Sequence, residues 1–202
     1  MVKLTKIYTR TGDDGSTGLS DFSRVSKTDA RIQAFADVDE ANSALGVAIS
    51  LAHEDFPAAS LQLMTQIQNQ LFDLGADLAT PLRHSYDYQP IRVDASWILT
   101  LEMAIDQHNE HLEKLDSFIL PGGTKLAAAL HLARTVARRA ERSAWQAIEK
   151  YGTEPTDSPE GGINLIAAAY LNRLSDLLFV LARYANLNHG GDVKWIPAAH
   201  RH

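Results

Sequence analysis

Five segments of this chain repeat apolar residues every three or four positions, and no segment alternates apolar and polar residues over the length of a strand. A period near 3.6 residues places those apolar side chains on one face of an α-helix. Because each segment has a single wide apolar stripe, an antiparallel bundle buries all the stripes most simply. The sequence therefore predicts an all-α fold, an antiparallel five-helix bundle, with helices at residues 28–53, 58–78, 94–112, 124–151 and 163–187.

The connections between the predicted helices are marked by proline and glycine, as in residues 80–90, 121–123 and 152–162. The first 27 residues differ from the rest, because they are rich in Thr, Gly, Asp and Ser and fit either an ordered loop or a disordered arm. The sequence contains no internal repeat or low-complexity tract. We expect one domain over residues 1–202, with residues 1–27 as its N-terminal segment.

The composition argues against several classes of protein. A formal net charge of −6 and a pI near 5.7 do not suit a nucleic-acid-binding protein, which presents a broad basic surface. The 202-residue chain has no cysteine, so disulfides and thiolate metal sites are excluded. The N-terminus lacks an apolar signal core, and no apolar run approaches the roughly 20 residues that cross a bilayer. We expect a cytoplasmic protein whose partners are neither nucleic acids nor membranes.

Three arginines recur at every fourth position of the fourth predicted helix: Arg134, Arg138 and Arg142. This spacing places them on one helix face, where like charges repel unless an anion lies opposite. The planar guanidinium group grips phosphate oxygens well, so a polyanionic small molecule is the first candidate ligand. The alternative is a solvated face neutralised by Glu141 and Glu149, but four arginines within nine residues favour phosphate binding. Glu141 could also hold an arginine in place or assist a bound metal ion.

The N-terminal segment carries three glycines at intervals of three residues, Gly12, Gly15 and Gly18. Glycines let backbone N–H groups face a ligand without interference from a Cβ atom, so such a loop can cradle phosphates. The segment is neither a Walker A sequence nor a dinucleotide-binding fingerprint. A flexible polar arm is the alternative. Hydroxyl and cationic side chains that could contact an anion are those of Thr9, Arg10, Thr11, Ser16, Thr17 and Lys27.

Polar residues in the first and fifth predicted helices allow two interpretations. Asn172, Arg173 and Asp176 lie in an apolar helix, so they should be paired either in an interhelical network or around a ligand. Asp39 and Glu40 in the first predicted helix could pair with the arginine ladder, the name used here for Arg134, Arg138 and Arg142.

Three further features of the sequence point less specifically to a function. Phe118 lies in an apolar connector near a predicted bundle end, where plugging of the core is the simpler interpretation. Residues 190–197 are expected to pack near the site or a neighbouring subunit. His108 and His111 lie one helical turn apart but lack a third ligand, so a solvated face is favoured over a metal site.

Taken together, four blocks of sequence resemble the PduO-type ATP:cob(I)alamin adenosyltransferases. The blocks are residues 6–17 with 24–27, residues 37–43, residues 118–123 with 133–142, and residues 170–176. The resemblance implies a homotrimer of five-helix bundles with active sites between subunits. It also implies transfer of the 5′-adenosyl group of ATP to the cobalt of reduced cobalamin, with release of triphosphate.

The resemblance also implies roles for individual residues. Asp39 and Arg134 would form an acid–arginine pair between subunits near the cofactor, and Phe118 would lie under the corrin and exclude its lower axial ligand. Arg138 joins these three as a catalytic residue, and no residue is expected to be a resident metal ligand. The implied ATP contacts are Thr9, Arg10, Thr11, Gly12, Thr17, Gly18, Lys27, Arg138, Arg139, Ala140, Glu141, Arg142 and Asn172.

The implied chemistry needs no protein nucleophile, because cob(I)alamin is itself a strong one. The protein would fix the geometry and stabilise the leaving triphosphate with arginines, loop amides, Lys27 and Mg²⁺. A flavoprotein reductase and a B12-dependent acceptor enzyme are the implied partners. Two alternatives remain open: a non-catalytic carrier of nucleotide or cobalamin, and a structural oligomer whose arginines only form salt bridges.

Overall fold

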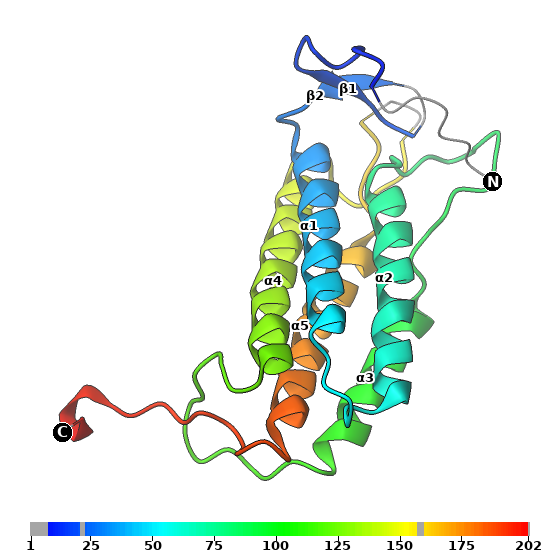
Figure 1. Cartoon of the computed structure of the whole chain (residues 1–202). Coiled ribbons are helices and arrows are strands. Elements are labelled where there is room, and N and C mark those ends of the chain that lie inside the picture. The colour runs from blue at the N-terminus through cyan, green and yellow to red at the C-terminus, as the bar shows by residue number, and fades with distance from the viewer. Residues whose placement is uncertain (1–7, 21–22, 157–159, 202) are drawn as a thin grey trace.

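A computed structural model of the chain describes residues 8–20, 23–156 and 160–201 and confirms the predicted all-α architecture (Figure 1). The helices begin and end within three residues of the predicted bounds. They are α1 (Ala30–Ser50), α2 (Ala58–Leu78), α3 (Ala95–Asn109), α4 (Lys125–Tyr151) and α5 (Leu165–Asn186).

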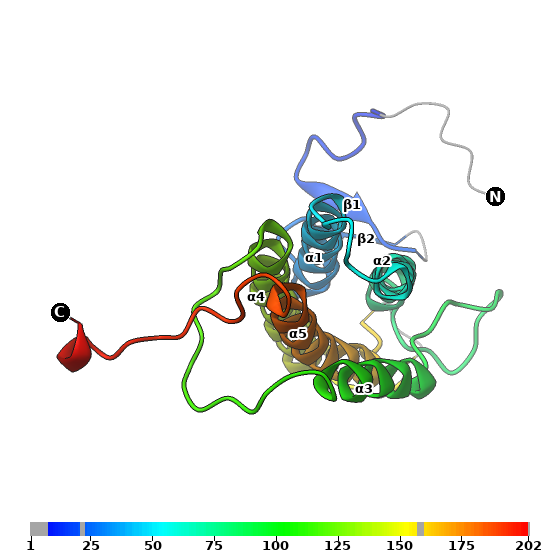
Figure 2. The same cartoon turned by 60° about the horizontal axis from the view of Figure 1, so that its bottom comes forward.

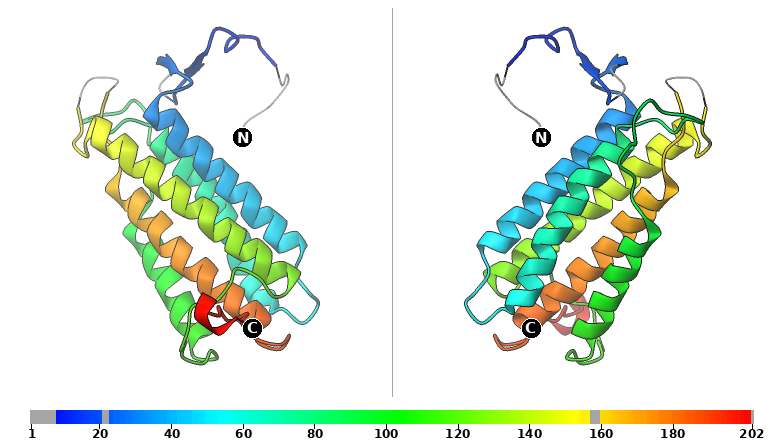
Figure 3. Two further views of the ribbon diagram at one scale, coloured as in Figure 1. Left: turned by 90° about the vertical axis from the view of Figure 1, so that its left-hand side faces the viewer. Right: turned by 90° about the vertical axis from the view of Figure 1, so that its right-hand side faces the viewer.

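The helices pack as an antiparallel bundle, in which α1, α3 and α5 run in one direction and α2 and α4 in the other (Figure 3). Seen toward one end, neighbouring helices follow the order α2, α1, α4, α5, α3 (Figure 2). Helix α4 therefore lies between α1 and α5. One of its faces stays open, since Leu132 and Trp145 on it are 58% and 44% exposed.

The core contains leucine, isoleucine and alanine side chains, and small residues on α4 let its neighbours approach closely: Ala137, Ala140 and Ala144 are fully buried. Among the described residues, α5 is the one helix long and apolar enough to cross a membrane by length and composition. Yet 61% of its most apolar stretch is buried inside the bundle. Packing in the core therefore accounts for its apolar composition.

Side chains that accept a backbone hydrogen bond begin four of the helices: Asp29, Asp94, Thr124 and Asn164. Asp94, the first residue of the third predicted helix, caps α3, because its carboxylate accepts from the Ser96 N–H at 2.8 Å. Such caps satisfy backbone donors that the first helical turn leaves unpaired.

The described part of the N-terminal segment contains two short antiparallel strands, β1 (Ser16–Gly18) and β2 (Arg24–Ser26), with Thr17 opposite Val25. They lie at the end of the bundle where α1 begins (Figure 1). The sequence predicted no strand here, because three residues are too few to show a period of two.

Candidate functional site

The arginine ladder lies on the open face of α4. Arg138 and Arg142 are exposed, and Arg134 is half-buried. Within the described ranges none of the three forms an ion pair. Arg142 donates to the Arg138 carbonyl at 2.9 Å, and the Arg134 guanidinium lies 5.9 Å from the centre of the Phe179 ring. Burial, and then the charge of Arg138, lower the pKa of Arg134. This face therefore concentrates positive charge that the described part of the chain does not balance with ion pairs, as a phosphate-binding surface requires.

Arg139 instead faces α1. Its guanidinium forms an ion pair with Glu40 and lies 3.6 Å from the Asp37 carboxylate. Asp37 is 5% exposed and also accepts from the Ser143 hydroxyl at 2.5 Å and the Gln33 amide at 2.9 Å. The hydrogen bond to Glu40 raises the pKa of Arg139. Glu40 therefore pairs with an arginine of α4, as expected, but with Arg139 and not with Arg134, Arg138 or Arg142.

Glu141 and Asn172 meet between α4 and α5, where the Asn172 amide donates to the Glu141 carboxylate at 3.1 Å. Both predicted ATP contacts therefore lie beside the ladder. Ala140, another of the predicted ATP contacts, is fully buried beneath this surface. Its role is to let α4 pack closely on the core.

Arg24 holds the N-terminal loop in a folded shape. Its guanidinium donates to the Thr11 carbonyl at 2.6 Å and to the Ser16 hydroxyl, and it lies 3.6 Å from the Asp14 carboxylate. Arg10 adopts a left-handed backbone conformation with φ of 62°, which non-glycine residues rarely adopt outside tight turns. Of the two interpretations left open by the sequence, the ordered loop is the correct one for this described part.

The amino group of Lys27 lies over Gly12. A β-carbon added at Gly12 would lie 3.2 Å from the Lys27 Nζ atom and 3.1 Å from the Ser16 carbonyl oxygen, so the close approach depends on glycine. The hydroxyls of Thr9 and Thr11 are hydrogen-bonded to each other at 2.9 Å. The loop thus gathers an ammonium group, hydroxyls and glycine backbone, the groups from which phosphate cradles are built.

The N-terminal segment joins the C-terminal end of α4 in this protomer and not the ladder itself. Asp29, which follows the hairpin, accepts from the Lys150 ammonium and the Tyr151 hydroxyl, both at 2.6 Å. Arg142 lies nine residues before Tyr151, a rise of about 13 Å along the helix.

The connector between α3 and α4, which contains Phe118, lies at the opposite end of the bundle (Figure 1). Its side chain is 79% exposed, which contradicts the interpretation that it plugs the core. The backbone N–H of Trp195 donates to the Phe118 carbonyl at 2.8 Å, and the Leu120 N–H donates to the Val193 carbonyl at 2.7 Å. The C-terminal segment therefore pairs with the connector and helps to present the Phe118 ring.

Asp39 and Arg134 lie on different sides of the bundle. Asp39 lines a groove of about 600 Å³ between α1 and α2, together with Phe35 and Phe72. Arg134 lies on the side of α4 that faces Phe179 of α5. An Asp39–Arg134 pair would therefore require a second protomer.

The prediction of a solvated helix face for His108 is wrong. His108 is 8% exposed, donates from Nδ1 to the Ala104 carbonyl at 2.7 Å, and accepts at Nε2 from the Ser60 hydroxyl at 2.8 Å. The interhelical network expected around Asp176 is confirmed, because Arg173 binds both Asp176 on α5 and Glu102 on α3.

Two residues that shape the site were not singled out from the sequence: Arg24, described above, and Asn186. The Asn186 side chain accepts from the Thr124 N–H at 2.9 Å and donates to the Gly122 carbonyl at 3.0 Å. It ties the Phe118 connector to the end of α5. An asparagine at the end of a strongly apolar helix was the available signal, since a buried amide needs partners.

Comparison with known proteins defines the class. A family model described as cobalamin adenosyltransferase matches residues 7–185, and the chain belongs to this family. More specifically, it is an ATP:corrinoid adenosyltransferase of the PduO type, as its sequence relatives and its structural neighbours agree.

One relative and two solved structures illustrate the similarity. A corrinoid adenosyltransferase of Mycobacterium tuberculosis (strain ATCC 25618 / H37Rv) is 54% identical over 200 residues, covering 99% of this chain and 97% of that protein. A variant PduO-type ATP:corrinoid adenosyltransferase from Lactobacillus reuteri, complexed with cobalamin and ATP, superposes with a TM-score of 0.83 at 36% identity, covering 95% of this chain and all of that one. Another variant, complexed with ATP, gives 0.80 at 37% identity over 94% and 100% of the two chains.

Proposed function

We propose that this transferase moves the 5′-adenosyl group of ATP to the cobalt of cob(I)alamin by direct attack of Co(I) on C5′. The Co(I) electron pair forms the Co–C bond, the C5′–O bond breaks, and its electrons leave with triphosphate. The observation that carries this proposal is the unbalanced charge of Arg134, Arg138 and Arg142 on the open face of α4. Fixed positive charge of this kind stabilises a leaving polyanion without reorganisation at the moment of reaction.

In this proposal the triphosphate lies between the ladder and the N-terminal loop. Arg138 and Arg142 supply charge from α4, and Lys27 with the backbone at Gly12 supplies it from the loop. Thr9, Arg10, Thr11, Thr17 and Gly18 belong to the same loop and hairpin, and Asn172 orients Glu141 beside the ladder. Arg139 acts indirectly in this proposal, because its ion pairs with Asp37 and Glu40 fix the position of α4 against α1.

Glu141 fits a role toward Mg²⁺. Its half-buried carboxylate lies beside the ladder and offers the oxygen donor that this ion prefers, and Mg²⁺ in phosphate sites is usually held by one or two carboxylates with substrate oxygens. Such an ion would neutralise part of the triphosphate charge.

We further propose that Phe118 forms an apolar floor for the corrin. Its exposed ring is presented at one end of the bundle by backbone pairing with the C-terminal segment. An apolar group beneath cobalt would displace the lower axial ligand and ease reduction to the nucleophilic Co(I) state.

A homotrimer with sites between subunits would complete this arrangement. Rotation about an axis parallel to the helices keeps each residue at the same level along that axis. The N-terminal loop of one subunit can therefore reach the part of the neighbouring α4 that carries Arg142. The same contact could bring Asp39 of the α1–α2 groove toward Arg134 of the next subunit. The exposed Phe72 ring, 72% accessible beside Asp39, supports burial of this groove by another copy.

The test is an anaerobic mixture of the protein with ATP, Mg²⁺ and chemically reduced cobalamin. Appearance of a light-sensitive Co–C bond with release of triphosphate supports the proposal, whereas binding of both ligands without alkylation would favour a carrier. Nucleotide binding that is lost in Arg138→Ala would dismiss a purely structural role for the arginines. A cytoplasmic location, a flavoprotein reductase and a B12-dependent acceptor enzyme stay predictions.

A further inference from the structure

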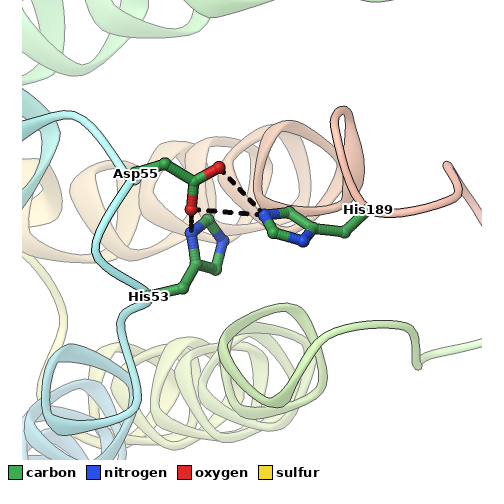
Figure 4. Close-up of side chains that lie close together, drawn as sticks. All are labelled: His53, Asp55 and His189. Atoms are coloured by element: carbon green, nitrogen blue, oxygen red, sulfur yellow. Dashed lines mark hydrogen bonds and ion pairs between the residues drawn. The ribbon is translucent and has the colours of Figure 1, made fainter.

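His53, Asp55 and His189 form a cluster that the proposed reaction does not use (Figure 4). His53 and Asp55 follow α1, and His189 lies in the turn after α5, so the cluster joins two segments far apart in the sequence. The ligand-type atoms of the three side chains all lie within 4.8 Å of one another. The His53 side chain is 23% exposed, which leaves the cluster within reach of solvent.

Both ring nitrogens of His53 lie close to oxygen acceptors. Its Nε2 atom lies 3.2 Å from the Ala185 carbonyl oxygen, which can only accept, so Nε2 donates in the tautomer that forms this hydrogen bond. Its Nδ1 atom lies 2.6 Å from a carboxylate oxygen of Asp55. In the neutral tautomer that donates from Nε2, Nδ1 carries a lone pair, and this lone pair and the carboxylate at 2.6 Å need a cation between them. That cation is either a proton or a metal ion.

His189 approaches the same carboxylate from the other side. Its Nε2 atom lies 3.1 Å and 3.3 Å from the two Asp55 oxygens. Desolvation acts to raise the pKa of Asp55, but the hydrogen bond to His53 and the nearby histidines outweigh it and hold that pKa below its usual range. Two imidazole nitrogens thus converge on one ionised carboxylate.

We propose that these three residues bind a divalent first-row transition metal ion of the Zn²⁺ type, through His53 Nδ1, an Asp55 oxygen and His189 Nε2. Zinc accepts this mixed nitrogen and oxygen set in tetrahedral geometry, with water as a fourth ligand. Metal–ligand bonds of about 2.1 Å place neighbouring ligand atoms about 3.4 Å apart. The two histidine nitrogens lie 2.6 to 3.3 Å from the Asp55 oxygens and within 4.8 Å of each other, so binding an ion requires a small outward movement of the Asp55 carboxylate, whose side chain is 55% exposed.

The surroundings of His53 suit a metal ligand. Metal-binding histidines usually donate their second ring N–H to a carbonyl or carboxylate, which fixes the orientation of the ring. The contact from Nε2 to the Ala185 carbonyl is of this kind. The Phe56 ring packs against the His53 ring edge-to-face at 5.7 Å and supports it from the protein side.

The bound ion would link the turn after α1 to the turn after α5. The latter turn leads directly to Val193 and Trp195, which pair with the Phe118 connector. The ion would therefore stiffen the bundle end that presents Phe118, a consequence that rests on the proposed function, whereas metal binding itself does not.

The experiment uses the untagged full chain, stripped with a chelator and titrated calorimetrically with Zn²⁺. We expect one ion per chain and a higher Tm with the ion bound. Asp55→Asn and His189→Ala should each weaken binding at least tenfold. Glu54→Gln removes the adjacent carboxylate charge and His84→Ala removes an exposed histidine elsewhere, so both should bind like the parent protein.

Cobalt(II) supplies a second readout, because nitrogen ligands in a tetrahedral site give it strong visible absorption. That absorption should appear with the parent protein and vanish in His53→Ala. Lack of saturable Zn²⁺ binding, or binding that survives both Asp55→Asn and His189→Ala, would overturn the proposal. So would binding that disappears when only the tail residues His200 and His202 are replaced by alanine. Each of these outcomes leaves the adenosyl transfer activity free to be present, so failure here is distinct from failure of the proposed function.

Discussion

Trp195 holds Phe118 by two contacts: its backbone N–H donates to the Phe118 carbonyl at 2.8 Å, and its indole meets the Phe118 ring edge-to-face at 6.1 Å. Residues 77 positions apart in the chain thus fix an aromatic ring that is otherwise open to solvent. If Phe118 forms the corrin floor, the C-terminal segment belongs to the active site as a positioning element.

Replacement of Trp195 by alanine should impair use of cobalamin and leave use of ATP unchanged. An aromatic pair of this geometry contributes about 1 kcal/mol beyond its buried area, which corresponds to about a fivefold loss in kcat/KM for cobalamin. The measurement is steady-state adenosylation with each substrate varied in turn. Trp195→Phe keeps an aromatic ring and should recover most of the loss; an equal loss for both substrates would argue against a positioning role.

Replacement of Arg138 by alanine should lower kcat by about 10² to 10³, as does loss of one preorganised charge donor elsewhere. Arg138 has no acidic partner among the described residues, so the substitution leaves no buried charge unpaired and the fold should persist. Lys125→Ala removes an exposed cation at the start of the same helix and serves as the matched control. Unchanged turnover in the Arg138 variant would contradict the proposed triphosphate site.

Replacement of Gly12 by alanine should raise KM for ATP while the bundle stays folded. The added methyl group would lie 3.1 Å from the Ser16 carbonyl oxygen and 3.2 Å from the Lys27 amino group, so Lys27 or the Ser16 backbone must shift by a few tenths of an ångström, which disturbs the proposed phosphate cradle. Gly122→Ala is the control, because a β-carbon there has no atom within 4 Å and Gly122 lies in the connector before α4, at the bundle end opposite the N-terminal loop. Titration of nucleotide binding in both variants checks this, and equal ATP affinity would exclude a role for the Gly12–Lys27 contact.

The sequence predicted the bundle well because each helix carries its own periodic stripe and most carry their own caps. The apolar stripe of the first predicted helix also allows a prediction that was not made, which concerns Asp37. Asp37 falls between Ala34, Val38 and Ala41, at the spacing that faces the core, so its burial and its pairing with a helix-four cation could have been predicted.

Other features could not follow from the sequence. The pairing of Phe118 with Trp195 and the meeting of His53 with His189 join residues distant in the chain, and local periodicity does not encode such contacts. The three-residue strands β1 and β2 are too short for alternation to appear. The division of the arginines into Arg139, paired within the protomer, and its neighbours on the open face depends on the angle at which α4 packs between α1 and α5.

Replacement of Asp37 by alanine should lower the free energy of unfolding by about 2 kcal/mol. Removing one partner of a fully buried ion pair costs more than this, because the other charge is left buried and unpaired. Here the Arg139 side chain is 42% exposed, so water and Glu40 still stabilise its charge after Asp37 is removed. The Ser143 hydroxyl also loses its acceptor. Urea unfolding measures the change, and a double-mutant cycle with Ser143→Ala should show coupling. An additive cycle would mean that the 2.5 Å contact contributes little.

Replacement of His131 by leucine should stabilise the protein at low pH. His131 is 2% exposed and neither ring nitrogen has a hydrogen-bond partner within the described chain. Burial first, and then the positive charge of Arg134, lower its pKa, although Asp192 acts in the opposite direction. The folded state therefore binds a proton at His131 less readily than the unfolded state does. This means that stability is fully present above the ordinary histidine pKa of about 6.5 and is lost as pH falls below it.

Leucine removes that dependence and leaves no unpaired ring nitrogen, so the stability of the variant should match or exceed that of the parent protein at pH 7.5 and exceed it by more at pH 5. Thermal unfolding at the two pH values measures this, and an equal stability difference at both would show that His131 does not resist protonation in the fold.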